Sequence, residues 1–395
     1  MRSSISLLLG AGFSAPMGYP IGNQLNNLLL NCTGDEFAFH SNGSLVTSTD
    51  GKKPYFGHKT SYDIRFDFCK KMIKYFKESR GNFDYEEFYD FIKDQAHEDK
   101  QVELLAQSFV IDEKVDQLVY SLDNIYTQLI SYYLKDSDGN AFYDNSGYVI
   151  GSFFPKYTGI LNYLNKISEK NVLNIHTLNH DLFFERLNNT EWLRGELCDG
   201  FEELGSPYYG GLEVNGRVYH ARLERYTGNY RKNLRLYKLH GSRDYVVYYT
   251  FKGNIGKPEK YLKTRFGIGF SDLYKEKEND NKELEYEFSP SNYHADFLTG
   301  TTSKIERYND PLLYKDLFKL FKHNLKEAKF LLIIGYGGKD REINKMIFEN
   351  FNFKNKKSFI IDPFPGENVK ELSARLNSKI IEKQLEEIQL TDIII

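Results

Sequence analysis

The sequence predicts an α/β fold, a Rossmann-like parallel sheet with helices on both faces. Short and mostly apolar runs at 5–9, 172–177 and 330–334 are each followed by a turn and then by residues with helical spacing. Two of these turns are rich in glycine, at 10–12 and at 335–338. Strands that alternate with helices pair in parallel through right-handed crossovers, so this order indicates a parallel sheet.

Length and composition indicate a folded protein with room for two domains. The chain has 395 residues, 41% of them hydrophobic and 27% charged, which excludes a disordered chain or a fibre. Its 52 basic and 55 acidic residues give a formal charge of -3, so we expect no direct contact with nucleic acid and no attraction to anionic membranes. No apolar run approaches the roughly 18 residues of a membrane helix. Three cysteines form neither a paired disulfide framework nor a four-cysteine zinc site, which favours a cytoplasmic location.

The first part of the chain is expected to contain a strand at 5–9, the glycine turn and a helix at 23–30. Three further segments place apolar residues three and four positions apart and predict helices: 63–79, 85–96 and 115–134. We therefore expect a helical module over 31–149 and an α/β domain made of 1–30 and 150–395.

Beyond residue 150, strand and helix patterns alternate. Helices are expected at 153–167, 181–187, 312–325 and 341–351. Strands are expected at 172–177, 234–239, 245–251, 330–334 and 358–361. The stretch 252–308 is rich in Lys, Glu, Asn and Gly and is expected to be a variable insertion.

The first motif, Gly10-Ala11-Gly12-Phe13-Ser14-Ala15, fits a GxGxxA pattern between a strand and a helix. Such glycines allow the backbone to approach a pyrophosphate at the positive end of a helix, but a purely structural turn is an equal alternative. An ordinary dinucleotide-binding fingerprint also needs an acidic residue at the end of a second strand. Asp35 and Glu36 lie at the right distance but follow a helix, which disfavours a standard dehydrogenase.

The second motif, Thr177-Leu178-Asn179-His180-Asp181, follows a predicted strand. Ligands of open parallel sheets bind at the carboxyl ends of the strands, so Asn179 is a candidate to orient a ribose hydroxyl or a water. The alternative is that Asn179 or Asp181 caps the next helix. His180 is expected to be a surface neighbour.

The third motif, His240-Gly241, also ends a predicted strand, and we expect Gly241 to leave open space beside the histidine. A histidine with a pKa near its ordinary value accepts a proton from water or a hydroxyl at neutral pH. A histidine that is bonded to backbone and has only a structural role is the alternative. The other histidines show no spacing typical of metal ligands, so no metal is expected.

Two further loops complete the set. Gly335-Tyr336-Gly337-Gly338 follows a predicted strand and allows phosphate or ribose contact, while Asp340 has the position of a helix cap. Asp362 ends the next strand, where a carboxylate accepts hydrogen bonds from ribose hydroxyls, although it is also a turn former before a proline.

Taken in order, these motifs resemble the sirtuin family, over the first thirty residues and most of the chain from about 150 onward. The resemblance implies NAD as the ligand, held by the glycine motif through Gly10, Ala11, Gly12 and Ser14. It implies that Asn179 and Asp181 lie on the nicotinamide side and that His240 is the general base. It also implies that Gly335 and Tyr336 line the cofactor and that Asp362 faces the adenosine ribose.

The chain also departs from that family. Deacylating sirtuins carry two CxxC pairs after the catalytic histidine, whereas no cysteine follows Cys198 here, so no zinc ribbon is expected. Leu178 replaces the usual glutamine, and Ile21-Gly22-Asn23 follows Pro20 in place of a Phe-Arg pair. These losses remove support for acyl-lysine binding while the groups for NAD remain.

This combination resembles bacterial sirtuin-like NAD hydrolases of antiphage defence, which imply NAD as a substrate cleaved to nicotinamide and ADP-ribose. Such an activity requires control, and the resemblance implies a homo-oligomer, with 31–149 as an assembly surface, and a HerA-type hexameric ATPase as partner. Two other functions stay open at this point. An NAD-dependent protein deacylase would consume NAD only with an acylated peptide, and a sensor would bind NAD or ADP-ribose without turnover.

Overall fold

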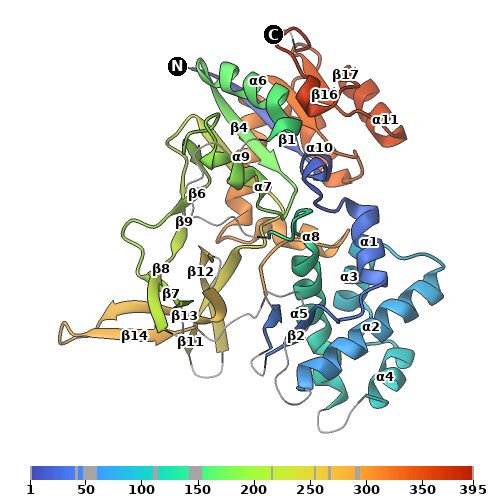
Figure 1. The fold of residues 1–395 in the computed structure, drawn as a ribbon, viewed down its shortest axis with the longest axis vertical. Coiled ribbons are helices and arrows are strands. Elements are labelled where there is room, and N and C mark those ends of the chain that lie inside the picture. Colours follow the sequence, from blue (N-terminus) through green and yellow to red (C-terminus); the bar gives the residue numbers. More distant parts are fainter. Residues whose placement is uncertain are drawn as a thin grey trace.

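The centre of the molecule is a seven-stranded sheet in which every neighbouring pair of strands is parallel (Figure 1). The computed structural model describes residues 2–40, 43–47, 60–109, 114–141, 154–214, 217–252, 255–265, 268–289 and 294–393. Across the sheet the strands are β17 (Lys379–Ile381), β16 (Ser358–Ile361), β15 (Ala328–Ile334), β1 (Ser3–Leu9), β4 (Asn171–Thr177), β10 (Leu234–Lys238) and β5 (Leu197–Cys198). The predicted parallel sheet is confirmed.

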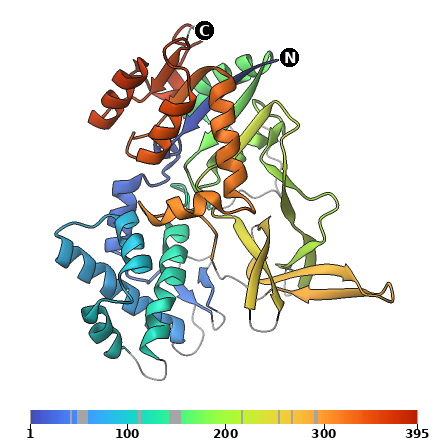
Figure 2. The ribbon, with the colours of Figure 1, turned by 180° about the vertical axis from the view of Figure 1, so that it is seen from behind.

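Helices cover both faces of this sheet because its strands are apolar on both sides. On β1, Ile5, Leu7 and Leu9 pack in one core with α6 (Thr158–Ser168), whereas Leu8 faces the opposite core. That second core is filled by α9 (Tyr314–Glu327), α10 (Arg341–Asn350) and α11 (Glu367–Leu376). Figure 2 shows α9 lying along the sheet. The short α7 (Phe183–Arg186) follows β4.

A separate helical layer lies at one end of the sheet (Figure 1). It consists of α1 (Gly22–Leu30), α2 (Ser61–Arg80), α3 (Tyr85–Asp94), α4 (Lys100–Gln107) and α5 (Val115–Tyr133), with a small hairpin of β2 (Phe37–Phe39) and β3 (Leu45–Thr47). These elements share a core rich in phenylalanine. The predicted helices match α2, α3 and α5, and α4 was not predicted. The division into domains stays a prediction.

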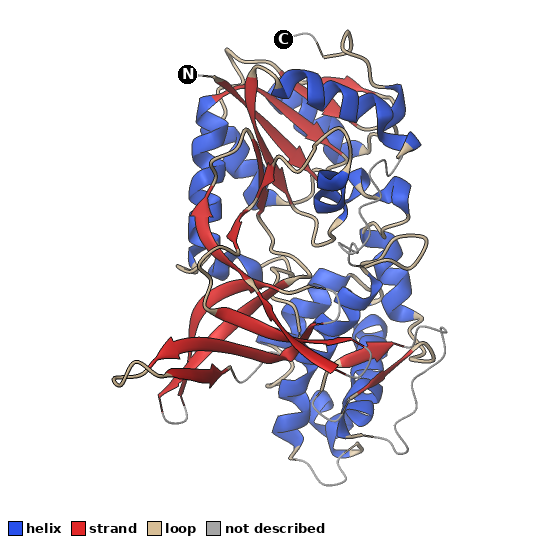
Figure 3. Cartoon of the chain, turned by 60° about the vertical axis from the view of Figure 1, so that its left-hand side comes forward, coloured by secondary structure: helices blue, strands red, loops and turns tan. Residues whose placement is uncertain are grey.

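The remaining strands form two antiparallel sheets of four strands each (Figure 3). One contains β11 (Tyr245–Lys252), β12 (Ile255–Lys263), β9 (Glu224–Asn229) and β6 (Gly200–Glu202). The other contains β14 (Leu284–Phe288), β13 (Ile268–Glu278), β7 (Tyr208–Val214) and β8 (Arg217–Arg222). The predicted insertion 252–308 thus supplies β12, β13 and β14 and then α8 (Ser303–Glu306).

Some predictions fall outside the described residues: position 153 at the start of a predicted helix, and parts of 31–149 and 252–308. Across the described ranges, no helix is both long and apolar enough to span a membrane.

In the central sheet, successive strands are added first on one side of β1 and then on the other, so the order of the strands reverses at β1. The chain passes from β1 to β4 and β10 on one side, and then returns to β15 and β16 on the other. In open parallel sheets, ligands bind outside the carboxyl ends of strands at such a switch point.

Candidate active site

All five predicted loops lie at the carboxyl edge of the central sheet. Gly10 follows β1, Asn179 follows β4, His240 follows β10, Gly335 follows β15 and Asp362 follows β16. Parallel pairing brings these loops to one edge, although they are far apart in the sequence.

The glycines of the first and fourth motifs allow two loops to pack directly against each other. A Cβ at Gly10 would lie 2.6 Å from the carbonyl oxygen of Gly335, and a Cβ at Gly12 would lie 2.8 Å from Gly335 Cα. The amide of Gly12 donates to that same carbonyl at 2.9 Å. Gly335 has a φ of +61°. The glycines are therefore required by contacts within the protein, whatever ligand they also meet.

The helix expected at 23–30 is present as α1, and a short irregular segment separates it from the glycine turn. Residues Ala11–Phe13 and Ala15–Met17 form two short 3₁₀ turns, and α1 begins only at Gly22. The long helix of an ordinary pyrophosphate-binding turn therefore does not start at this motif.

Asn179 ties the second motif to the first. Its side-chain nitrogen Nδ2 donates to the carbonyl oxygen of Gly10 at 3.0 Å and to Ser14 Oγ at 3.1 Å. Ser14 Oγ in turn donates to Asp181 Oδ1 at 3.1 Å. Ser14 is fully buried, whereas Asn179 is only half-buried. The asparagine is therefore held in one orientation at the surface of the network.

Asp181 lies inside the protein and has a structural partner as well. Its Oδ1 accepts the backbone amide of Phe183 at 3.0 Å, which supports the turn before α7 as the capping alternative predicted. Burial raises the pKa of Asp181, and nearby Lys238 opposes this effect. Lys238 donates to the backbone carbonyl of Asp181 and pairs with buried Glu185 at 2.9 Å.

His240 is buried, and its environment differs from the prediction. Burial, then the charge of Lys304, lowers the pKa of His240 to about 3, against a predicted value near the ordinary one. The expected open space is also absent at Gly241, where a Cβ would lie 2.8 Å from Phe297 Cα and φ is +79°. The reason is that the chain segment before α8 packs over this loop: the amide of Leu298 donates to the His240 carbonyl at 2.7 Å.

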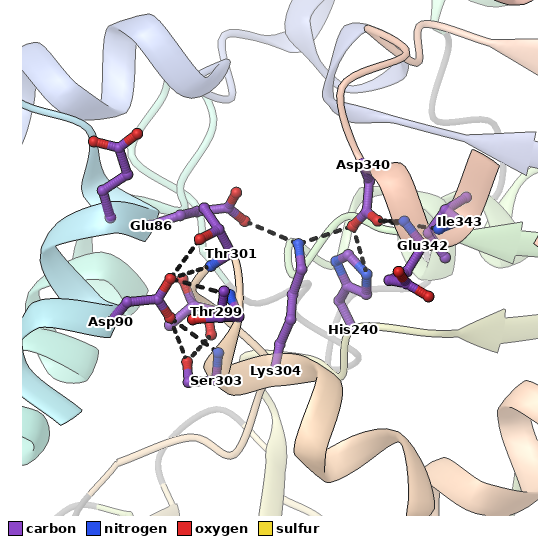
Figure 4. Close-up of polar contacts among 12 residues, drawn as sticks. Glu86, Asp90, His240, Thr299, Thr301, Ser303, Lys304, Asp340, Glu342 and Ile343 are labelled. Atoms are coloured by element: carbon purple, nitrogen blue, oxygen red, sulfur yellow. Dashed lines mark hydrogen bonds and ion pairs between the residues drawn. The ribbon is translucent and has the colours of Figure 1, made fainter. Parts of the chain in front are cut away.

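A chain of charged side chains extends from His240 into the helical layer (Figure 4). His240 Nε2 lies 3.6 Å from Asp340 Oδ2. The same oxygen lies 2.8 Å from Lys304 Nζ, which is also 3.6 Å from Glu86 Oε1. Asp340 caps α10 as predicted, because its Oδ1 accepts the amides of residues 342 and 343 at 3.1 Å.

The sequence did not indicate Lys304 or Glu86. Each is one charge among many in segments rich in Lys and Glu, and no spacing relates them to His240. Only the capping position of Asp340 gave a local signal.

Three other predictions concern the neighbours of the site. The expectation that His180 is a surface residue is wrong: it is buried and its ring stacks on Phe297 with centroids 4.5 Å apart. Tyr336 is buried too, and its hydroxyl binds within its own loop, accepting the amide of Asp340 at 3.1 Å. Asp362 Oδ1 accepts the amide of Phe364 at 2.8 Å, as expected of a turn former before proline.

The described residues contain no group of three or more metal-ligating side chains. A groove of about 650 Å³ runs between α1 and the end of α5, beside Gly18 and Asp136, and none of the predicted site residues lines it.

The fold and these loops define a Rossmann-like α/β protein with a polar cluster at the switch point of its sheet. No family model matches the chain, and no curated protein matches it. Solved structures of Sir2 proteins are similar to it at 8–10% identity and TM-scores of 0.35. One, from work on the mechanism and regulation of Sir2 enzymes, covers 99% of this chain and 91% of its own. A Sir2 homolog–NAD complex covers 98% and 86%, and a mutant Sir2 homologue with 2'-O-acetyl ADP ribose covers 99% and 90%.

Proposed function

We propose that the protein hydrolyses NAD to nicotinamide and ADP-ribose. The observation that carries this proposal is the hydrogen-bonded network in which Asn179 joins Gly10 and Ser14 at the switch point of a parallel sheet. His240 follows β10, the strand that pairs with β4, and β4 precedes Asn179. A polar amide held in one orientation, on the loop next to the one that carries a histidine, suits a reaction that needs a positioned water and a proton acceptor.

The reaction breaks the bond between nicotinamide and the ribose. Nicotinamide leaves with the bonding electrons, positive charge develops on the ribose, and the oxygen of a water forms a bond to the anomeric carbon. The proton of that water passes to His240, whose imidazole is neutral at neutral pH because burial lowers its pKa, although the same shift makes it a weaker base while Lys304 lies against Asp340. Asn179 orients the water or the ribose hydroxyls. The loops at Gly12 and Gly335 lie on the side of the NAD phosphates.

The proposal is tested by the release of nicotinamide and ADP-ribose from NAD by the purified full chain, with and without an acetylated peptide. The Asn179→Ala and His240→Ala variants should each lose activity at least about 100-fold while remaining folded. Exposed Asn355 and His323 supply matched controls, since Asn355→Ala and His323→Ala change the same residue types away from the site.

The other outcomes decide between the alternative functions. Turnover that requires the peptide, with an acyl-ADP-ribose product, would indicate a protein deacylase. Saturable NAD binding without turnover, both alone and with partner ATPases, would indicate a sensor.

The biological setting is part of the same proposal. In this setting the protein depletes NAD during antiphage defence. The resemblance of the motifs to sirtuin-like NAD hydrolases supports it. Control would come from homo-oligomerisation or a HerA-type ATPase that contacts the helical layer. Co-purification of candidate ATPases with the full chain, followed by the NAD assay, tests this setting.

A further inference from the structure

Lys304 is a buried cation that lies between the helical layer and the candidate base. It belongs to α8, and its Nζ lies 2.8 Å from Asp340 Oδ2 on one side and 3.6 Å from Glu86 Oε1 on the other (Figure 4). A buried ammonium group needs such partners because the interior solvates charge poorly.

Asp340 has one oxygen for two neighbours. Oδ1 is occupied by the first amides of α10, so Oδ2 alone faces both Lys304 and His240. In the present arrangement Lys304 is the closer partner. His240 Nε2, at 3.6 Å, has no hydrogen-bond partner within the described residues.

The helical layer fixes Lys304 through two carboxylates on one face of α3. Glu86 supplies the second charge partner. Asp90, one turn later, accepts the amides of Thr301 at 2.8 Å, Thr302 at 3.0 Å and Ser303 at 3.1 Å, immediately before Lys304. Residues four apart lie on the same side of a helix, so α3 holds both the charge and the backbone of Lys304.

We propose that Lys304 is a positioning residue through which the helical layer sets how readily His240 accepts a proton. With Lys304 against Asp340, the carboxylate is neutralised and a cation faces the imidazole, so protonation of His240 is disfavoured. Movement of Lys304 toward Glu86 frees Asp340 Oδ2 to accept a hydrogen bond from protonated His240, which makes the histidine a stronger base. A partner that shifts α3 would thereby tune the site.

The charged and titratable groups around His240 agree with this assignment. Lys304 lowers the pKa of His240 and Asp340 raises it, after the larger effect of burial. His180, whose ring centroid is 6.3 Å away, is itself neutral because burial holds its pKa well below the ordinary value. Glu86 acts through Lys304, and burial raises its pKa to about 7, so its charge changes near neutrality.

The test is a pH titration of the histidine ring signals of the full chain by NMR, with the His240 signal assigned by its loss in His240→Asn. In the wild type, His240 should stay neutral down to pH 5. In Lys304→Met the midpoint should rise by about one unit or more, because Asp340 then faces the imidazole alone. Lys304→Arg retains the cation and should behave as the wild type.

Lys93→Met is the matched control, since it removes a cation of α3 that pairs with Asp123 away from the site. If Lys304→Met does not fold, the charge-balanced double variant Glu86→Gln/Lys304→Met replaces it. An unchanged His240 midpoint in a folded variant without Lys304 overturns the proposal.

The catalytic meaning of this inference rests on the proposed NAD hydrolysis, but the NMR titration does not. If the protein cleaves NAD, the acidic limb of its pH profile of kcat/KM should move to higher pH in Lys304→Met, in parallel with the NMR midpoint. An NMR shift in a protein that never cleaves NAD would sustain the role of Lys304 and contradict the proposed function alone.

Discussion

Single residues at the sheet edge are constrained first by contacts inside the protein. Gly335 adopts a left-handed φ of +61°, and a Cβ there would lie 2.7 Å from Gly12 Cα. Two loops from distant parts of the sequence thus approach at the backbone level. A glycine motif that looks like a phosphate cradle is, in this chain, also the packing contact that holds the site together.

Gly335→Ala should therefore destabilise the protein by about 2–4 kcal/mol, from backbone strain and the displaced loop. Chemical denaturation measures this change. Gly337→Ala is the matched control, because nothing lies within 4 Å of the position of its Cβ. Equal stability of the two variants would contradict the close packing described for Gly335.

Asn179→Asp tests whether the donor nitrogen or the shape of the side chain matters. Aspartate has the same size but cannot donate to the carbonyl oxygen of Gly10, and it places a second carboxylate near Asp181. We expect the proposed NAD hydrolysis to be lost and stability to fall by about 1–3 kcal/mol, measured by turnover and thermal unfolding. Asn355→Asp, at an exposed position, should change neither turnover nor stability. Full activity of Asn179→Asp would contradict the role of the Asn179 side chain as a hydrogen-bond donor.

At the scale of elements, α8 is too short to hold its own position. It spans only Ser303–Glu306, and its first turn depends on Asp90 of α3. A Cβ at Gly300, which has a φ of +95°, would collide with the Asp90 carboxylate, so the two segments interlock. Asp90 and its donors thus form one of the links that join the helical layer to the sheet edge.

Asp90→Ala should destabilise this junction by about 1–3 kcal/mol, since the amides and hydroxyls of the segment before α8 lose a buried acceptor. Hydrogen exchange should accelerate at residues 299–306 more than in the central sheet. Asp94→Ala, at an exposed position on the same helix, is the control. Unchanged protection of residues 299–306 would show that other contacts hold the segment.

The success of sequence prediction differed between kinds of element. Strands such as β1 and β15 are apolar on both faces, so their runs were recognisable without any partner. β12 was missed because the stretch 252–308 is rich in Lys, Glu, Asn and Gly, which predicted a variable insertion; in the structure its Pro258 pairs opposite Tyr249, where the register shifts. β8 was missed because nearly all of it is exposed.

At the scale of the whole molecule, buried neutral histidines make the fold sensitive to acid. Burial lowers the pKa of both His176 and His240 to about 3, whereas an unfolded histidine titrates near 6.5. Below pH 6.5 the unfolded chain binds protons that the folded chain does not. The stability that these histidines contribute is therefore present above pH 6.5 and is lost progressively as the pH falls toward 3.

When the pH falls from 7 to 5, each such histidine should lower the free energy of unfolding by about 2 kcal/mol. His240→Asn should reduce the loss over this interval by that amount, as measured by urea denaturation at both pH values. His323→Asn, at an exposed position, should leave the loss unchanged. A His240→Asn protein with the full wild-type loss would show that His240 is not kept neutral.

The sequence by itself determined the alternation of strands and helices and the five loops at the carboxyl edge of the sheet. Those features follow from local patterns and from the rule that alternating strands pair in parallel. Only the tertiary structure decided that His240 is buried. It also decided that Asp340 and Lys304 lie in line between His240 and Glu86. The reason is physical: proton affinity and ion pairing depend on distances and on exclusion of water, and packing between distant segments sets both.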